Sequence, residues 1–298
     1  MKKLLLLIST LLLLASCSPA KEDGGIMKVT ATTNIVADLV SEIGGDRVEV
    51  TAMMHAGVDP HIYKAKPSDV TAIQNADVVI FNGVTLEAKL ADVLEGLESI
   101  NKKVINVGLG INQTDILIND VEHGVDPHIW FDVSIWKDAA NYVASRLSQF
   151  EPESKDYFND NLKAYLLELD VLDQYIYDRV AEIPESKRVL VTAHDAFNYF
   201  AHRYGMEVKA IQGISTQSEA GIRDINELAN FIVENDIKAV YPESSVPIKT
   251  IESLVAAIED KGYSVSLGKE LYSDSLKDNA NYIETFRENV DNIVDALK

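Results

Sequence analysis

Two short stretches of the chain are almost identical, and each carries a histidine after an Asp-Pro pair. They are GVDPHIY at 57–63, the first corner, and GVDPHIW at 124–130, the second corner, which match at six of seven positions. Proline fixes its own φ and restricts the preceding residue to extended geometry, so each pair presents the next side chain from a stiff turn. Ligands that are ordered in advance lose little conformational entropy on binding. The two corners therefore predict two imidazoles, His61 and His128, that are positioned to bind a metal ion.

Two more candidate ligands occur in the second half of the chain. His194 directly follows the strand-like segment RVLVTA, and Asp274 follows the last strand-like segment within LGKELYSDSL. Open parallel sheets bind ligands beyond the carboxyl ends of their strands. Two imidazoles from one half are thus able to meet one imidazole and one carboxylate from the other half in a cleft. For the carboxylate, Glu270 and Asp278 are the alternatives nearby in the sequence.

The chain has six histidines, and the other three have simpler interpretations. His55 lies six residues before His61, and we expect it to be solvent-exposed near the mouth of the cleft, with a role in metal entry as the alternative. His123 falls in the loop before the second corner, where transient capture of metal is a hypothesis. His202 belongs to the helix predicted after His194, and we expect it on the surface.

Several residues next to the candidate ligands have no role that the sequence alone can fix. Metal-bound imidazoles usually donate their second N–H to a carboxylate or a carbonyl. Asp59, Asp126 and Asp195 are neighbours of candidate ligands, but adjacent side chains often point apart, so we assign them no such role. Trp130 and Phe197 either shield the site from water or pack in the core.

Strand-like and helix-like segments alternate along the chain. In the first half the predicted strands are 28–33, 47–54, 76–83 and 103–108, and in the second half they are 188–193, 206–213, 237–243 and 263–268. Such alternation is typical of βαβ units with parallel strands. The fold class is therefore α/β with two lobes, each a parallel sheet flanked by helices. We predict an N-terminal lobe over 28–152 and a C-terminal lobe over 184–298.

One long helix is predicted between the lobes. Residues 153–183 contain no Gly or Pro, and apolar residues recur at steps of three and four. This pattern predicts one helix of about 30 residues and about 45 Å, given a rise of 1.5 Å per residue. A coiled-coil arm is the alternative, but the segment is short and lies mid-chain. We expect a rigid connector between the lobes, which disfavours a large hinge closure.

The N-terminus has the layout of an export signal. Residues 1–17 have two lysines, an apolar run and small residues before Cys17, the only cysteine. The apolar run is shorter than the ~20 residues that cross a bilayer. Residues 14–17 also resemble a bacterial lipobox, which predicts cleavage before Cys17 and its lipidation, with an ordinary secretory signal as the alternative. Residues 18–27 then form a flexible tether, and the protein is anchored to the outer face of the cytoplasmic membrane.

The charge of the chain excludes some classes of partner. Its formal net charge is −20, which becomes −22 once Lys2 and Lys3 are removed with the signal. Strong negative charge disfavours binding to nucleic acid and to anionic lipid surfaces. It is compatible with a cationic ligand, although most of these charges are expected on a solvated surface.

The motifs together identify a family. The chain resembles the cluster A-I substrate-binding proteins of ABC importers for divalent transition metals, the TroA- and ZnuA-like group. The resemblance covers essentially the whole mature chain and includes both corners, VLVTAHDAFNYFAHRYG, YPESSVP and LYSDSL, in fixed order. It implies two α/β lobes joined by one rigid helix, a monomer that delivers metal to an ABC permease, and His61, His128, His194 and Asp274 as ligands.

The implied ligand set restricts the metal. Three imidazoles and one carboxylate suit zinc, whereas copper(I) prefers sulfur, and calcium and magnesium prefer oxygen. Manganese binders of the family usually carry Glu at the position of His194, and dedicated zinc binders often have a His-rich loop where this chain has only His123. We expect both zinc and manganese to bind as the transported substrate, with zinc tighter in vitro.

Two other functions compete with metal transport. A zinc hydrolase needs an open coordination position and a general base, as in His-Glu-x-x-His. That motif is absent from the sequence, and four protein ligands leave no position for an activated water, so we expect no enzyme activity. The second alternative is a surface adhesin, a role described for lipoproteins of this family, although no segment of the sequence marks an adhesive surface.

Overall fold

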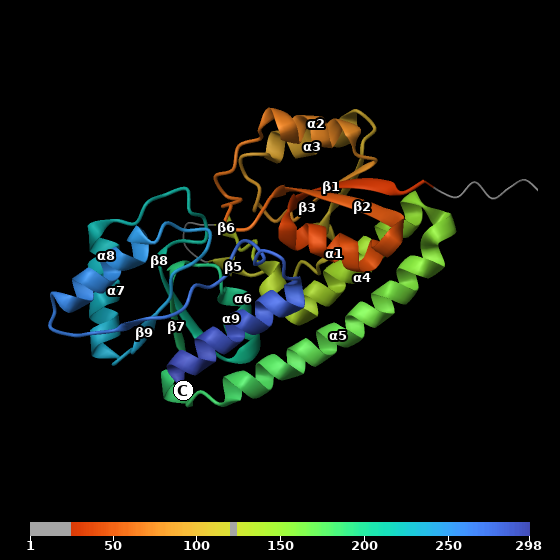
Figure 1. Ribbon diagram of the computed structural model, residues 1–298. Coiled ribbons are helices and arrows are strands. Elements are labelled where there is room, and N and C mark those ends of the chain that lie inside the picture. The colour runs from red at the N-terminus through yellow and green to blue at the C-terminus, as the bar shows by residue number, and fades with distance from the viewer. Residues whose placement is uncertain (1–24, 120–123) are drawn as a thin grey trace, which may run out of the picture.

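The computed structural model describes residues 25–119 and 124–298, which form two α/β lobes beside one long helix (Figure 1). The predicted signal, Cys17, most of the predicted tether and His123 lie outside the described residues. Within the described ranges, every helix is too short or too polar to cross a membrane.

The N-terminal lobe contains a parallel sheet with strand order β2-β1-β3-β4. Its strands are β1 (Met27–Thr33), β2 (Val48–Met54), β3 (Val78–Phe81) and β4 (Lys103–Asn106). Helices α1 (Asn34–Gly44) and α4 (Val133–Phe150) cover one face, and α2 (Pro67–Asn75) and α3 (Ala91–Ser99) cover the other (Figure 1). Strand β3 is completely buried because both faces of the sheet are covered, which explains its continuous apolar sequence.

The C-terminal lobe contains two parallel strand pairs. They are β7 (Val189–His194) with β8 (Glu207–Gln212), and β9 (Ala239–Val240) with β10 (Ser266–Leu267). A parallel bridge between Thr192 and Tyr241 joins the pairs into the order β8-β7-β9-β10. Helices α7 (Ile222–Glu234) and α8 (Lys249–Glu259) cover one face, and α6 (Asn198–Tyr204) and α9 (Tyr282–Leu297) cover the other.

Short elements complete the described fold. Strands β5 (Ile118–Asn119) and β6 (Gly124–Val125) pair antiparallel just before the second corner. Five single-turn 3₁₀ helices occur at η1 (Gly45–Arg47), η2 (Val107–Gly110), η3 (Ile129–Phe131), η4 (Pro152–Ser154) and η5 (Glu185–Lys187).

The long helix predicted between the lobes is α5 (Lys155–Ala181), whose 27 residues span about 40 Å. It is two residues shorter at each end than predicted, because residues 152–154 form a 3₁₀ turn and the helix ends before Pro184. Its buried residues are those of the predicted apolar stripe, namely Phe158, Leu162, Tyr165, Leu169, Leu172, Ile176 and Val180.

Helix α9 lies alongside α5 and also contacts the N-terminal lobe (Figure 1). Arg179 of α5 donates from Nε to Asp291 Oδ1 at 2.9 Å and from Nη2 to Asp295 Oδ1 at 2.9 Å. At the other end of α9, the backbone N–H of Tyr282 donates to Asp38 Oδ2 of α1 at 3.1 Å. Buried side chains from α1, α4, α5, α6 and α9 form one continuous apolar cluster. The two lobes therefore share a core, which opposes a large hinge movement.

Candidate metal centre

The four candidate ligands lie at or after the ends of strands, or at the start of a tight turn. His61 follows β2, His128 immediately precedes the 3₁₀ turn η3, His194 is the last residue of β7, and Asp274 follows β10. All four side chains are buried, with exposed fractions of 2% or less. The parallel strands bring these chain segments to the junction of the lobes, as the sequence predicts.

The donor atoms of the four residues all lie within 4.8 Å of one another. Nε2 of His128 is 3.3 Å from Asp274 Oδ1, and Nε2 of His194 is 3.4 Å from Asp274 Oδ2. The two Nε2 atoms are 3.4 Å apart, and Nε2 of His61 is 3.9 Å from Asp274 Oδ1. Ligands about 2.1 Å from a tetrahedral zinc ion are about 3.4 Å apart. The spacing therefore suits one metal ion between all four groups.

Two of the converging atoms have no other partner. Nε2 of His61 and Oδ1 of Asp274 are buried and accept or donate no hydrogen bond within the described structure. Burying a polar atom without a partner costs free energy, and such atoms in a native protein need an explanation. A cation bound by these lone pairs supplies it.

Asp126 orients the ring of His128. Its Oδ1 lies 2.7 Å from ring Nδ1 and also accepts the backbone N–H of His128 at 3.0 Å. With Nδ1 facing the carboxylate, Nε2 is the atom that faces the centre. Carboxylate–imidazole pairs of this kind fix the tautomer and raise the basicity of a metal ligand.

Glu243 has the same relation to His194. Its Oε1 accepts the backbone N–H of His194 at 2.7 Å, and its Oε2 lies 2.5 Å from ring Nδ1. Glu243 is 3% exposed and follows β9 at a bridge to Leu271. Sequence reasoning missed this residue, although it lies in the YPESSVP motif at a strand end, which was the signal used for the other candidates.

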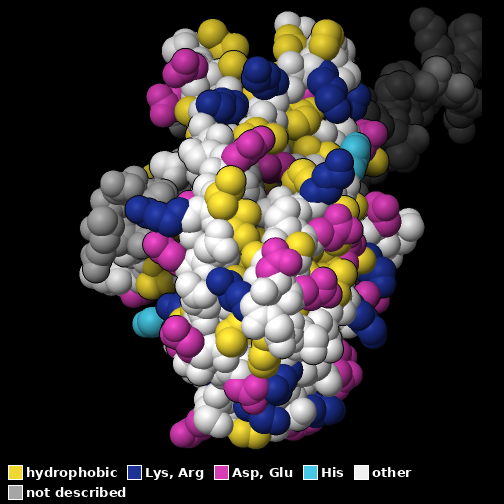
Figure 2. All heavy atoms as spheres, turned by 90° about the vertical axis from the view of Figure 1, so that its left-hand side faces the viewer, with side chains coloured by type: hydrophobic (Ala, Val, Ile, Leu, Met, Phe, Trp, Pro, Cys, Tyr) yellow, Lys and Arg dark blue, Asp and Glu magenta, His cyan; other side chains and the backbone are white. Residues whose placement is uncertain are grey.

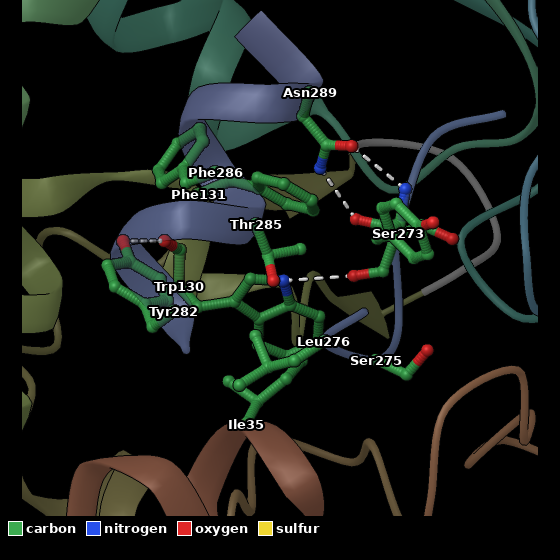
Figure 3. Close-up of a pocket in the computed structure, with 11 residues that line it drawn as sticks. Ile35, Trp130, Phe131, Ser273, Ser275, Leu276, Tyr282, Thr285, Phe286 and Asn289 are labelled. Carbon is green, nitrogen blue, oxygen red and sulfur yellow. Dashed lines mark hydrogen bonds between the residues drawn. The ribbon is translucent and has the colours of Figure 1, made fainter. Parts of the chain in front are cut away.

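Asp274 is carried by a loop that several elements hold in place. Ser245 Oγ donates to Asp274 Oδ2 at 3.0 Å. Figure 3 shows the apolar side of the loop, where Trp130 Nε1 donates to the carbonyl of Ser273 at 3.0 Å and the amide of Asn289 bonds the backbone N–H and C=O of Tyr272. Neither alternative carboxylate, Glu270 or Asp278, joins the cluster, and both are exposed.

His61 is held differently. Asp59 Oδ1 accepts its backbone N–H at 2.9 Å, and Asp59 Oδ2 accepts the hydroxyl of Thr216 at 2.5 Å from the C-terminal lobe. Asp59, Thr216 and the half-exposed Ile62 line a groove at the lobe junction. The groove is lined by residues on both sides of His61 in the sequence, so this corner lies nearer to solvent than the second corner.

The electrostatic environments of the imidazoles differ. Burial lowers the pKa of His61 to about 3, because the attraction of Asp274 does not offset desolvation. Burial also acts to lower the pKa of His128, but Asp126 and Asp274 outweigh it and raise the value to about 9. Burial opposes protonation of His194 as well, yet Glu243 and Asp274 raise its pKa well above the usual range. Against the opposing effect of burial, these histidines hold the pKa of Asp274 well below its usual range.

The other sequence candidates have clear positions. His55 and His202 are exposed, as expected. Trp130 shields the centre, since its ring centroid lies 5.3 Å from that of His128. Phe197 packs in the core against Phe131, with centroids 4.4 Å apart. Asp195 bonds through its backbone to Gly213 and belongs to no ligand cluster.

The described part of the surface seen in Figure 2 shows no separate cluster of histidines and carboxylates like that of the buried site. On the face seen in Figure 2, acidic and basic side chains are interspersed with apolar ones over the described residues. The candidate metal-binding groups, three imidazoles and one carboxylate, are instead gathered in the buried cluster.

Known proteins share this architecture. The family model for ZnuA, the periplasmic component A of a zinc-uptake complex, matches residues 29–296. The chain is 41% identical over 276 residues to the manganese-binding lipoprotein MntA of Bacillus subtilis, covering 91% of this chain and 90% of that protein. It is 39% identical over 282 residues to the zinc-binding protein TroA of Treponema pallidum, covering 93% and 91%.

Solved structures of related proteins have the same fold. The periplasmic zinc-binding protein TroA of Treponema pallidum superposes with a TM-score of 0.89 at 39% identity, covering 92% of this chain and 99% of TroA. A mutant of the laminin-binding adhesin Lmb of Streptococcus agalactiae superposes with a TM-score of 0.80 at 25% identity, covering 91% and 100%. The predicted two-lobe α/β fold is thereby confirmed, and the chain belongs to the ZnuA family of metal-binding transport proteins.

Proposed function

We propose that the protein captures a divalent transition metal ion between its lobes and delivers it to an ABC permease. His61, His128, His194 and Asp274 are the proposed ligands. The observation that carries the proposal is the convergence of their four buried donor atoms within 4.8 Å. The manganese- and zinc-binding names of the relatives support the same cargo.

Zinc and manganese are the proposed cargo. Three neutral imidazoles and one carboxylate match four-coordinate zinc. Asp274 presents Oδ1 toward His128 and Oδ2 toward His194, so both oxygens face the centre and are able to chelate one ion. A fifth donor makes the site suitable for manganese as well, while the Irving–Williams order favours zinc in vitro.

The partner and the location follow from this role. An ABC permease in the cytoplasmic membrane is the proposed acceptor of the ion, because the chain belongs to a family of metal-uptake proteins. The lipobox-like residues 14–17 support export and attachment to the outer face of that membrane through lipidated Cys17. We propose that the protein works there as a monomer. The lipoprotein name of the Bacillus subtilis relative supports this anchor.

The alternative functions have less support. Hydrolysis needs a coordination position for water, and the four protein donors occupy the tetrahedral positions of the proposed site. An adhesive role is supported only by the printed name of the Streptococcus agalactiae neighbour. Binding to laminin by a variant that no longer binds metal would separate that role from transport.

The direct test compares two aspartates of one loop. Asp274→Ala removes a buried proposed ligand, whereas Asp278→Ala removes an exposed carboxylate four residues away. We expect wild type and Asp278→Ala to bind one equivalent of zinc or manganese, measured by elemental analysis and competition titration. Asp274→Ala should lose at least about 100-fold in affinity, because one of four ligands supplies about a quarter of the binding free energy of a zinc site.

Equal binding by all three proteins would contradict the proposed site. If wild type bound no equivalent of either metal after complete removal of contaminating ions, the proposed function itself would be wrong. Delivery is tested separately, by metal accumulation in cells whose own copy is deleted and replaced by either variant.

A further inference from the structure

A side chain of the C-terminal lobe contacts the carboxylate that orients a proposed ligand of the N-terminal lobe. Asn198 begins α6, four residues after His194, and its Nδ2 donates to Asp126 Oδ2 at 3.1 Å. The other oxygen of Asp126 is the one that contacts the ring and the backbone of His128. Both oxygens of the buried Asp126 carboxylate are thus hydrogen-bonded, one to His128 of the N-terminal lobe and the other to Asn198 of the C-terminal lobe.

In the hydrogen bond between Asn198 and Asp126, only the Asn198 amide can be the donor. A carboxylate accepts hydrogen bonds and an amide NH₂ donates them, so Asn198 has only one orientation that satisfies Asp126. The next residue adds a second contact, because the hydroxyl of Tyr199 donates to the backbone carbonyl of Asp126 at 3.0 Å and accepts the N–H of Leu117. Asp126 is 1% exposed, so water does not replace a lost partner readily.

We infer that Asn198 is a positioning residue that couples contact between the lobes to retention of the metal ion, by holding Asp126 and through it the ring of His128. Ligand groups have to stay within about 0.5 Å of their working positions for a site to function. When the lobes separate, Asn198 moves away with the C-terminal lobe, Asp126 is released, and Nε2 of His128 loses its fixed direction. The inference rests on the proposed function, since it requires metal at these four residues.

The test measures release of zinc and uses two variants. Asn198→Ala removes the donor, and Asn198→Asp keeps the shape but replaces the donor with a second acceptor that repels Asp126. Metal-loaded protein is mixed with excess EDTA in a stopped-flow instrument. We expect the dissociation rate to rise about 10-fold in Asn198→Ala, the lower end of the effect of losing an indirect partner of a ligand. Asn198→Asp should release the ion at least as fast.

Two readouts separate positioning from simple loss of stability. The visible spectrum of the cobalt(II)-loaded protein should change in both variants, because one ligand is less well oriented. The matched control is Asn226→Ala in α7, where the side-chain amide donates to the carbonyl of Ile222 in the same helix and to no other group of the described residues. We expect the control to keep both the release rate and the spectrum of wild type.

The outcomes distinguish this inference from the proposed function. Wild type that binds no zinc refutes the proposed function. Wild type that binds zinc, together with an unchanged spectrum and a release rate within twofold of wild type in either folded Asn198 variant, refutes only the role of Asn198. A lower melting temperature of the metal-free variant with unchanged release has the same meaning, since it shows a structural role alone.

Discussion

The two corners share one sequence but provide different environments for their histidines. In both, the aspartate accepts the backbone N–H of the histidine two residues on, at 2.9 Å in the first corner and 3.0 Å in the second. In the second corner the same oxygen also reaches ring Nδ1, and the pKa of His128 rises to about 9. In the first corner burial lowers the pKa of His61 to about 3.

The two corners differ in the partner of the imidazole ring and in the chain that follows the histidine. The first corner continues into the half-exposed Ile62, the buried Tyr63 and then exposed residues 64–66 before α2. The second continues into Ile129 and Trp130, which are buried under α4 and α9. The motif therefore fixes a turn in both corners, while the contact of Asp126 with the ring, which Asp59 does not make with His61, raises the pKa of His128 against the opposing effect of burial. As proposed ligands, His61 would be neutral before metal binds, whereas His128 would first have to lose a proton.

The largest expected effect comes from removing each imidazole in turn. A structural zinc site is worth about 10–16 kcal/mol, so one ligand in four is worth about 2.5–4 kcal/mol, or about 100- to 1000-fold in affinity. We expect His61→Ala near the lower value. His128→Ala should fall near the upper value, because it also leaves Asp126 facing an empty space. Competition titration measures both, with the exposed His202→Ala as the control.

Equal losses in the two variants would show that the corners are energetically equivalent despite their different environments. A loss in His202→Ala of similar size would show instead that the assay reports on folding.

The pH dependence of binding tests the same contrast. At pH 7 the metal-free protein carries protons on His128 and His194, whose pKa values are raised, and none on His61, whose pKa is about 3. Metal displaces these protons, so lowering the pH weakens binding. We expect release of about two protons at pH 7 and a fall in apparent affinity of about 100-fold per pH unit between pH 5 and 8. Calorimetry in buffers of different ionisation enthalpy measures the number of protons.

In His61→Ala the number of released protons should stay the same, because His61 is already neutral. A decrease by one proton in that variant would mean that the difference between the corners is reversed or absent.

A smaller effect is expected from the two corner aspartates. Asp126→Asn weakens the contact with ring Nδ1 of His128, and loss of such a partner costs about 10- to 100-fold in metal affinity. Among the described residues, Asp59 bonds only the backbone N–H of His61 and the hydroxyl of Thr216. We therefore expect Asp59→Asn to cost less than Asp126→Asn in the same titration. The reverse order would show that the first corner depends more on its aspartate than the second.

The smallest effect is spectroscopic. Trp130 lies against His128, whereas Trp136, the other tryptophan, stacks on Tyr282 in the core. Metal binding changes the protonation of His128, so the fluorescence of Trp130 should respond to it. We expect the metal-induced change to disappear in Trp130→Phe and to persist in Trp136→Phe. A signal that persists in Trp130→Phe would place its origin outside the second corner.

Much of the architecture could be predicted from local patterns. The apolar stripe of α5 and the continuous apolar run of β3 are properties of neighbouring residues, and the sequence contains them directly. The predicted strands 237–243 and 263–268 shrink to two paired residues each, in β9 and β10. Their β-branched residues do favour extended chain, but strand length depends on the partner available, which no local pattern records.

The candidate ligands were predictable for a similar reason, since each follows a recognisable strand or corner. Glu243 also follows a strand, but its role and that of Asn198 depend on contacts across 49 and 72 residues of sequence, which local patterns do not record. Asp59 and Asp126 stood beside candidate ligands, yet adjacent side chains point in different directions, and only the folded corner shows that these two turn back onto the histidine.

The position of α9 has a consequence for biosynthesis. Its residue Asn289 bonds the backbone of Tyr272 in the loop of Asp274, and its Tyr282 donates to the carbonyl of Trp130, whose indole N–H bonds Ser273 of the same loop (Figure 3). The helix also packs along α5 between the lobes. A chain interrupted before α9, by premature termination or by a protease, would still carry all four donor groups but would lack the element that seats the carboxylate. Only the intact polypeptide would then load metal, and truncated copies would reach the transporter without it.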